Sequence, residues 1–164
     1  MFNEINKFIS SSVPVFFFSL LLIFGANAFA ATCSVTSGSM NFGAYNPFLG
    51  SNTDSNSTFS ITCNGLVGEN VAYTATLTSG SANGFSPRKM VSGAGGSLNY
   101  NFFVNSSRTT IMGDGTSGTS LINDSYSLAS TNATKSYSLY GRVFALQNVP
   151  VGVYSDTLTL QISF

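Results

Sequence analysis

The sequence predicts an all-β protein built as an antiparallel β-sandwich. Short segments in which apolar and polar residues alternate are separated by turns rich in Gly, Ser and Asn, and no useful length of sequence repeats with the period of a helix. Charged residues make up only 7% of the 164 residues. Hydrophobic residues make up 43% and are regularly placed, so the chain can build a core.

Composition argues against several classes of function. The net charge is zero, and no basic patch could hold a nucleic-acid backbone. His is absent, which removes the Ser-His-Asp and Cys-His catalytic arrangements and the imidazole metal ligands. The acidic residues are scattered, whereas a two-carboxylate hydrolase needs a close pair. We therefore expect no catalytic site, no cofactor, no metal, no small-molecule substrate and no nucleic-acid partner.

Residues 1–30 predict a secretory signal peptide. The apolar run over residues 15–24 has the length of a signal-peptide hydrophobic region and is short for a bilayer span. Small residues follow it, and we place cleavage after Ala30, with Ala28 as the second choice. An uncleaved membrane anchor is the alternative, against which the short run and the small-residue motif argue. The mature domain is then residues 31–164.

Export determines how the two cysteines are interpreted. Cys33 and Cys63 both lie in the mature chain, and an even pair in an exported protein predicts a disulfide. The absence of a Cys-x-x-Cys arrangement and of His argues against a zinc site. The bridge would close a loop of about thirty residues and contribute about 3–4 kcal/mol in the chain-entropy model.

The first predicted strands lie on either side of a turn region. Residues 33–42 alternate weakly, and Gly38 predicts a bulge or bend within them. Residues 58–63 predict a second strand, so the disulfide would tie the start of the first strand to the end of the second. Residues 71–78 predict a third strand with these side chains directed inward: Val71, Tyr73, Ala75 and Leu77.

The middle of the sequence has longer loops. A loop is predicted over residues 79–97, and its adjacent charges, Arg88 and Lys89, are interpreted as a solvated pair. A strand is predicted over residues 98–104. Residues 113–132 predict a second long loop, with a short strand near residues 126–128.

A strong strand is predicted over residues 136–146. It is apolar on both faces beyond Gly141, which is typical of a central strand. Arg142 on this strand and Asp156 further on are candidates for an ion pair. Asp114, between two glycines, is interpreted as a turn residue and not as a calcium ligand.

The last segment, residues 154–164, alternates strictly. One face would carry Leu158, Leu160, Ile162 and Phe164, and no later segment of the sequence can pair with this strand. A long apolar edge of this kind is usually protected. Six or seven strands joined by polar loops predict a sandwich of the immunoglobulin-like type, and the unpaired last strand predicts that the sandwich is incomplete.

Several short motifs, in this order and at these spacings, resemble the spore coat protein U domain family, which also forms the subunits of archaic chaperone–usher pili. The motifs are CSV at 33–35, NFGAYNP at 41–47, FSITC at 59–63, RKM at 88–90, LNY at 98–100, GDG at 113–115, YGR at 140–142 and GVYSDTLTLQISF at 152–164.

The resemblance implies a sandwich that lacks its last strand. A periplasmic chaperone would lend a strand to the open groove, and an outer-membrane usher would exchange that strand for the N-terminal extension of a neighbouring pilus or coat subunit. The chain would therefore be exported to the periplasm and then displayed at the cell surface or secreted. On this resemblance we expect four residues to form the core and the chaperone or donor-strand groove: Leu158, Leu160, Ile162 and Phe164.

The sequence departs from the rod subunits of this family in one respect. After the predicted cleavage only Ala31 and Thr32 precede Cys33, and two residues at about 3.3 Å each cannot fill such a groove. We expect a subunit that receives a strand without donating one, such as a tip subunit, a chain terminator or a secreted coat protein. Loop aromatic residues such as Tyr45, Phe48 and Phe85 could be adhesive, although ordinary loop packing is the stronger expectation. The alternative function is a self-contained secreted binding module, for example one that binds carbohydrate.

Overall fold

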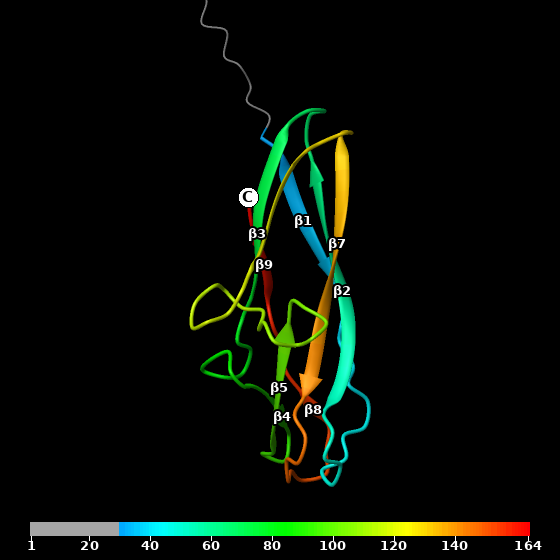
Figure 1. Ribbon diagram of the computed structural model, residues 1–164, viewed down its shortest axis with the longest axis vertical. Helices are drawn as coiled ribbons and strands as arrows, with labels where there is room; N and C mark the ends of the chain where they lie inside the picture. The colour runs from blue at the N-terminus through cyan, green and yellow to red at the C-terminus, as the bar shows by residue number, and fades with distance from the viewer. Residues whose placement is uncertain (1–29) are drawn as a thin grey trace, which may run out of the picture.

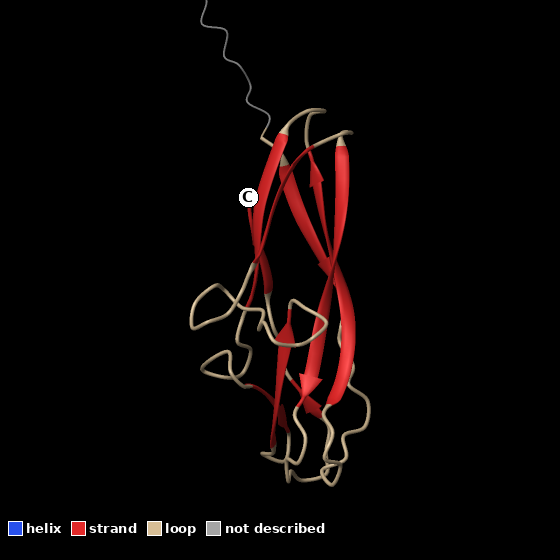
Figure 2. Ribbon diagram, in the orientation of Figure 1, coloured by secondary structure: helices blue, strands red, loops and turns tan. Residues whose placement is uncertain are grey.

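The computed structural model describes residues 30–164, and this part of the chain contains strands, turns and loops but no helix (Figures 1 and 2). No helix long and apolar enough to cross a membrane is therefore found within residues 30–164. The predicted signal peptide lies outside the described residues, except for Ala30. The strands are β1 (Thr32–Ser37), β2 (Thr53–Asn64), β3 (Asn70–Leu77), β4 (Arg88–Ser92), β5 (Ser97–Phe103), β6 (Ile122–Ser127), β7 (Asn132–Val143), β8 (Tyr154–Ser155) and β9 (Leu160–Ser163).

The strands form two antiparallel sheets. The larger sheet has the order β1-β2-β7-β5-β4-β8, and the smaller sheet has the order β6-β3-β9. The predicted all-β, immunoglobulin-like sandwich is confirmed, and so is the central position of β7, which pairs with β2 on one side and β5 on the other. β1 and β9 are edge strands of different sheets; they lie near each other without pairing (Figure 1).

The core lies between the sheets and is built from residues at alternate positions. β2 and β3 supply a regular series of buried side chains, because every second residue of a strand points to the same face. That series is Phe59, Ile61, Cys63, Val71, Tyr73, Ala75 and Leu77. β5 contributes buried residues from both faces, including Tyr100, Asn101 and Phe102.

The Cys33–Cys63 disulfide is confirmed. Cys33 lies opposite Cys63 in the β1–β2 register, with the two Cα atoms 4.0 Å apart. The bridge holds β1 at the edge of the larger sheet, where β1 pairs on one side only. Since Cys63 is fully buried, the disulfide also fixes this end of β1 against the core.

The predicted loop over residues 79–97 contains a strand, and the interpretation of Arg88 was wrong. β4 lies within this segment, and Arg88, its first residue, is fully buried, whereas Lys89 is exposed. The Arg88 guanidinium donates hydrogen bonds to Thr78 O, Met112 O and Asn101 Oδ1, and it lies 5.1 Å from the centre of the Phe85 ring.

No carboxylate forms a salt bridge with Arg88 among the described residues. Burial of the guanidinium lowers the pKa of Arg88 to about 10, which still leaves it charged at neutral pH. Its hydrogen bonds reach the end of β3 in one sheet and β5 in the other. Arg88 therefore joins the two sheets by hydrogen bonds where an apolar residue would join them by packing.

Two further expectations were wrong. The last segment is not one unpaired strand, since β8 pairs with β4 in the larger sheet and β9 pairs with β3 in the smaller sheet. Arg142 forms its ion pair with Asp54, at 2.7 Å, and not with Asp156. The Arg142 guanidinium, by hydrogen bonding, also lowers the pKa of the Asp54 carboxyl below its usual range.

Replacing Arg88 by Ala tests the contribution of this buried network. The change leaves buried acceptors without donors, and each such acceptor costs about 1–3 kcal/mol, so we expect a loss of about 3 kcal/mol or more. Urea unfolding of the purified protein measures the loss. The control is Lys89→Ala on the exposed neighbour, which we expect to stay within about 0.5 kcal/mol of the original protein. Equal losses in the two variants would contradict this role for Arg88.

Candidate functional site

A groove runs along the open side of the sandwich, between the chain that continues from β1 and the last segment. One wall is formed by residues 37–42 and the other by residues 154–160, with residues 57–59 at one end. The groove contains a cavity of about 350 Å³. Its floor comes from both sheets and is apolar or aromatic, formed by Phe59, Leu77, Met90, Tyr100, Phe102 and Leu139.

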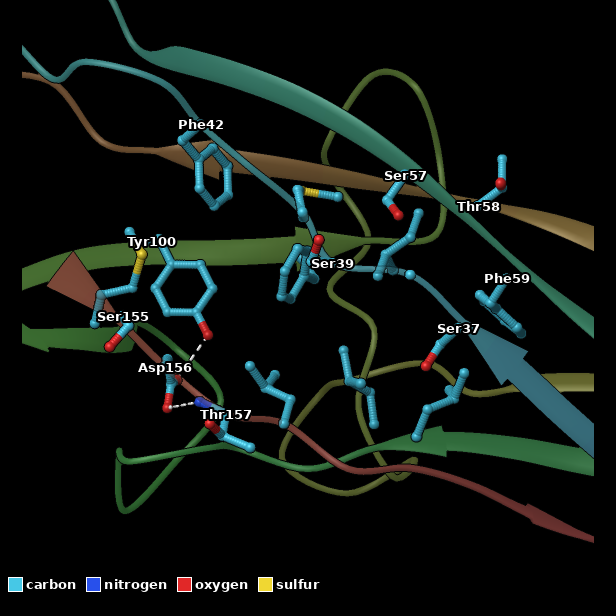
Figure 3. A pocket seen from close by; sticks show the side chains of 18 of the residues that line it. Ser37, Ser39, Phe42, Ser57, Thr58, Phe59, Tyr100, Ser155, Asp156 and Thr157 are labelled. Carbon is cyan, nitrogen blue, oxygen red and sulfur yellow. Dashed lines mark hydrogen bonds between the residues drawn. The ribbon is translucent and has the colours of Figure 1, made fainter. Parts of the chain in front are cut away.

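The close view shows how the side chains lie along this groove. Phe42 and Tyr100 lie at one end of the cavity, and Phe59 and Ser37 lie at the other (Figure 3). The Phe42 ring packs edge-on against Tyr100, with centroids 6.0 Å apart, and stacks on Phe102 at 6.4 Å. The floor is therefore aromatic and largely apolar, which suits it to receive apolar side chains.

The β1-side wall has an unpaired backbone. β1 stops pairing at Ser37, and residues 38–42 make no backbone–backbone hydrogen bond with any other described residue. Within residues 38–42, the one carbonyl that accepts a hydrogen bond from a described residue is Asn41 O, which accepts from Ser55 Oγ. Backbone N–H and C=O groups in a protein are nearly always paired, so this wall presents a row of groups that a further strand could satisfy.

Gly141 of β7 allows this wall to approach the core. Gly141 is buried, and a Cβ atom there would collide with Met40 Sδ and come within 2.7 Å of the Phe42 ring. Met40 and Phe42 are half-buried and pack on the core although their backbone is unpaired. Side-chain packing, and not strand pairing, therefore holds this wall in place.

The opposite wall changes sheet at Asp156. The Asp156 carboxylate accepts hydrogen bonds from Tyr100 Oη, from the backbone N and Oγ of Ser81, and from Thr157 N. Burial, and then the hydrogen bond to Asp156, raise the pKa of Tyr100 far above its usual range, so its hydroxyl stays protonated. Asp156 thus fixes the crossing between β8 and β9, and leaves Leu158 just beyond it without a backbone–backbone hydrogen bond to any described residue.

The four residues predicted for the groove lie in different places. Leu158 and Leu160 line the cavity. Ile162 is half-buried and packs on the core, opposite Ala75 of β3, without lining the cavity. Phe164 is 60% exposed.

Several groove residues were not predicted as such. Met40 and Phe42 alternate with polar residues, and this period was the available signal for them. Tyr100 and Phe102 lie on a predicted strand, but nothing local showed which face of that strand would line an opening. Only the relation between the two sheets brings them beneath the last segment.

The acidic residues described in the structure lie in separate places. Asp114 accepts from the backbone N and Oγ1 of Thr116, and these hydrogen bonds lower the pKa of its exposed carboxyl. Asp124 bonds to Lys135 and Tyr137, both of which lower the pKa of its carboxyl. Within residues 30–164, no three His, Cys, Asp or Glu residues are grouped so that they could hold a metal ion. Asp156 is the only one of these residue types lining the groove cavity.

The protein is an immunoglobulin-like sandwich that is open on one side, where the groove lies between residues 37–42 and residues 154–160. The family model of the Spore Coat Protein U domain matches residues 21–161. The chain therefore belongs to the Spore Coat Protein U domain family.

Comparison with solved structures agrees with this fold. One chain of the crystal structure of the CsuC–CsuE chaperone–tip adhesion subunit pre-assembly complex, from the archaic chaperone–usher Csu pili of Acinetobacter baumannii, is similar to this chain with a TM-score of 0.55 and 24% sequence identity. The match covers 82% of this chain and 40% of that chain, and it shows a shared fold. No curated protein matches this sequence.

The Gly141→Ala substitution tests how the β1-side wall is held. The added methyl group must displace Met40 or Phe42, and overpacking of this kind costs about 1–3 kcal/mol. Urea unfolding is the measurement. Gly50→Ala is the control, because no atom lies within 4 Å of a Cβ at Gly50, and this variant should unfold as the original does. A Gly141→Ala protein as stable as Gly50→Ala would show that the wall is not packed as described.

Proposed function

We propose that this chain is an exported, non-catalytic subunit of a surface fibre or coat, assembled through a chaperone–usher pathway by strand complementation. A periplasmic chaperone first supplies an extended segment to the groove, and a neighbouring subunit supplies it in the assembled structure, after exchange at an outer-membrane usher. The observation that carries this proposal is the groove itself, where unpaired backbone flanks an apolar floor. Strand addition at an open edge uses main-chain hydrogen bonds for affinity and side-chain pockets for specificity.

The family and the similar fold support this proposal. The similar solved chain comes from a complex whose name describes a chaperone with a tip adhesion subunit. In this chain Leu158 and Leu160 line the cavity, while Ile162 and Phe164 extend the same alternating series towards the end of β9. We assign these four residues to the wall that an incoming strand would follow.

A position at the end of a fibre follows from the predicted processing. Cleavage after Ala30 leaves Ala31 and Thr32 before Cys33, which is fixed by its disulfide. Two extended residues span about 7 Å, far less than the groove wall formed by residues 37–42. We propose that such a processed subunit accepts a strand and has none of its own to donate.

Capture by the chaperone tests the groove. In Leu158→Asp a charge is placed in the apolar cavity, and we expect the amount of chaperone that co-purifies from the periplasm to fall at least about ten-fold. The measurement is quantitative pull-down of the tagged subunit from the periplasm, with the co-purifying chaperone identified by mass spectrometry. The control is Gln161→Glu, a charge on an outward-facing residue of β9, which should leave capture unchanged. Undiminished capture by Leu158→Asp would overturn the proposal.

A second candidate property, adhesion, is favoured by a specific observation at one end of the sandwich. The loop between β1 and β2 and the loop between β7 and β8 lie together at the lower end in Figure 1, joined by hydrogen bonds from Gln147 N to Tyr45 Oη and from Ala145 N to Asn52 Oδ1. These loops expose large apolar side chains: Phe48 at 90%, Leu49 at 53%, Leu146 at 68%, Val151 at 102% and Val153 at 86%. The predicted loop packing therefore holds for Tyr45 but not for Phe48.

We propose that this apolar end contacts a hydrophobic surface. Clustered exposed apolar residues usually mark an interaction site, whereas single ones are ordinary. The triple variant Phe48→Ser, Leu146→Ser, Val151→Ser should lower adsorption of the purified protein to polystyrene beads by about ten-fold or more. The matched control is Leu66→Ser, Val67→Ser, which removes exposed apolar residues elsewhere on the chain. If both variants lose adsorption equally, the apolar end has no specific role.

A further inference from the structure

Glu69 is a partly buried carboxylate that accepts hydrogen bonds from backbone N–H groups and forms no salt bridge within the described residues. It lies half-buried in the turn between β2 and β3; its Oε1 accepts a hydrogen bond from Ala31 N, and its Oε2 accepts one from Leu66 N, both at 2.8 Å. No Lys or Arg among the described residues forms a salt bridge with it. A carboxylate partly removed from water, with two backbone donors and no cation, lacks the partner that usually balances its charge.

The turn holds this carboxylate in a fixed position. A Cβ on Gly65 would collide with Glu69 Oε2, and would lie 2.9 Å from Leu128 Cδ1 and 3.2 Å from Ala31 Cβ, so only glycine leaves room here. Leu128 N donates to Glu69 O at 2.9 Å, and Glu69 N donates to Leu66 O at 3.0 Å. Ala31 and Glu69 therefore meet in a small packed site.

The backbone nitrogen in this site is that of the residue that follows the predicted cleavage point. We propose that the site binds the α-amino group of Ala31, which a peptidase releases by hydrolysing the Ala30–Ala31 peptide bond. Water adds across that bond: the carbonyl carbon of Ala30 gains the oxygen and leaves as a carboxylate, and Ala31 N gains the proton. At neutral pH the free amine takes a further proton, because its ordinary pKa is about 7.7–8.0. The hydrogen bond to Glu69 then becomes an ion pair, which is shorter and stronger.

This ion pair would fix the start of β1. The Cys33–Cys63 disulfide lies two residues further along, so two attachments would hold the same end of an edge strand. Cleavage after Ala28 would leave Phe29 and Ala30 attached and Ala31 N an uncharged amide. The ion pair with Glu69 would therefore form after cleavage at Ala30 but not after cleavage at Ala28. The inference concerns processing and does not depend on fibre assembly.

The first test is the N-terminal sequence of the protein isolated from the periplasm, together with any chaperone that co-purifies. The expected first residue is Ala31. A chain that begins at Phe29, or that is not cleaved, overturns the proposal.

The second test is the rate at which the α-amino group reacts with acetic anhydride at about pH 7.5, followed by mass spectrometry of the N-terminal peptide. An amine paired with Glu69 has a raised pKa and reacts slowly, so Glu69→Gln should speed the reaction about ten-fold, the effect of one pKa unit. Asp114→Asn, which changes an exposed carboxylate in a separate turn, should leave the rate unchanged. If the native protein reacts as fast as the protein unfolded in urea, the amine is not bound.

A third comparison guards against misfolding of the Glu69→Gln protein. A chain engineered to begin at Phe29 keeps an amide at Ala31, so Glu69→Gln should lower its melting temperature less than it does in the chain that begins at Ala31. The extra loss should be complete near pH 6 and disappear as pH rises through the raised pKa of the amine, because a cation stabilised by folding contributes only while protonated. Equal losses in both chains at every pH would show that Glu69 only caps the turn.

Discussion

Backbone N–H and C=O groups near a protein core need hydrogen-bond partners, and the main feature of this structure is a stretch of chain beside the core whose backbone groups lack them. Along residues 38–42 the chain is drawn onto the core by Met40 and Phe42, but its backbone groups have no backbone partner in the described chain. Across the groove, Leu158 has none either. The hydrophobic effect holds the Met40 and Phe42 side chains against the core, but the backbone groups of residues 38–42 still lack backbone hydrogen bonds. An extended segment of another chain can make bonds of this kind without disturbing the packing.

The crossing at Asp156 forms part of the groove wall that faces residues 37–42. The last segment divides there between the two sheets, since β8 joins the larger sheet and β9 the smaller one. The carboxylate that fixes the crossing accepts hydrogen bonds from Tyr100 of β5 and from Ser81 in the loop between β3 and β4. Gly80 has a φ of 69°, and a Cβ there would come within 2.7 Å of the carboxylate carbon. Only glycine fits at position 80, because the positive φ disfavours other residues and because a side chain there would collide with the Asp156 carboxylate.

Much of the fold could be predicted because period-two alternation is a local signal. It located β3 and β5 within one residue, and it located β2 and β7 although both strands begin four or five residues earlier than predicted. β4 was missed because it has five residues and one of its inward positions is Arg88, which the pattern treats as solvent-exposed. The break in the last strand falls at Asp156, a polar residue at a position where the alternation requires an apolar one, and the segments on either side of it were interpreted as a single strand. The β2–β7 register places Arg142 opposite Asp54, so this register determines which carboxylate pairs with Arg142. No local sequence pattern indicates that register. The groove wall near Leu158 could be predicted as apolar, but the facing wall required the arrangement of the two sheets.

The β2–β7 pairing has a consequence for folding rate. Its register joins Thr53 to Val143 and Asn64 to Asn132, residues separated by 90 and 68 positions (143 − 53 and 132 − 64). Contacts between residues so far apart in the sequence form slowly. The chain loses the conformational entropy of closing the long loop before the strand pairs contribute any stabilising free energy. During that interval the apolar segments that later face the groove are exposed, and exposed strand edges aggregate. A partner that covers them early would therefore protect the chain kinetically, before it completes the fold thermodynamically.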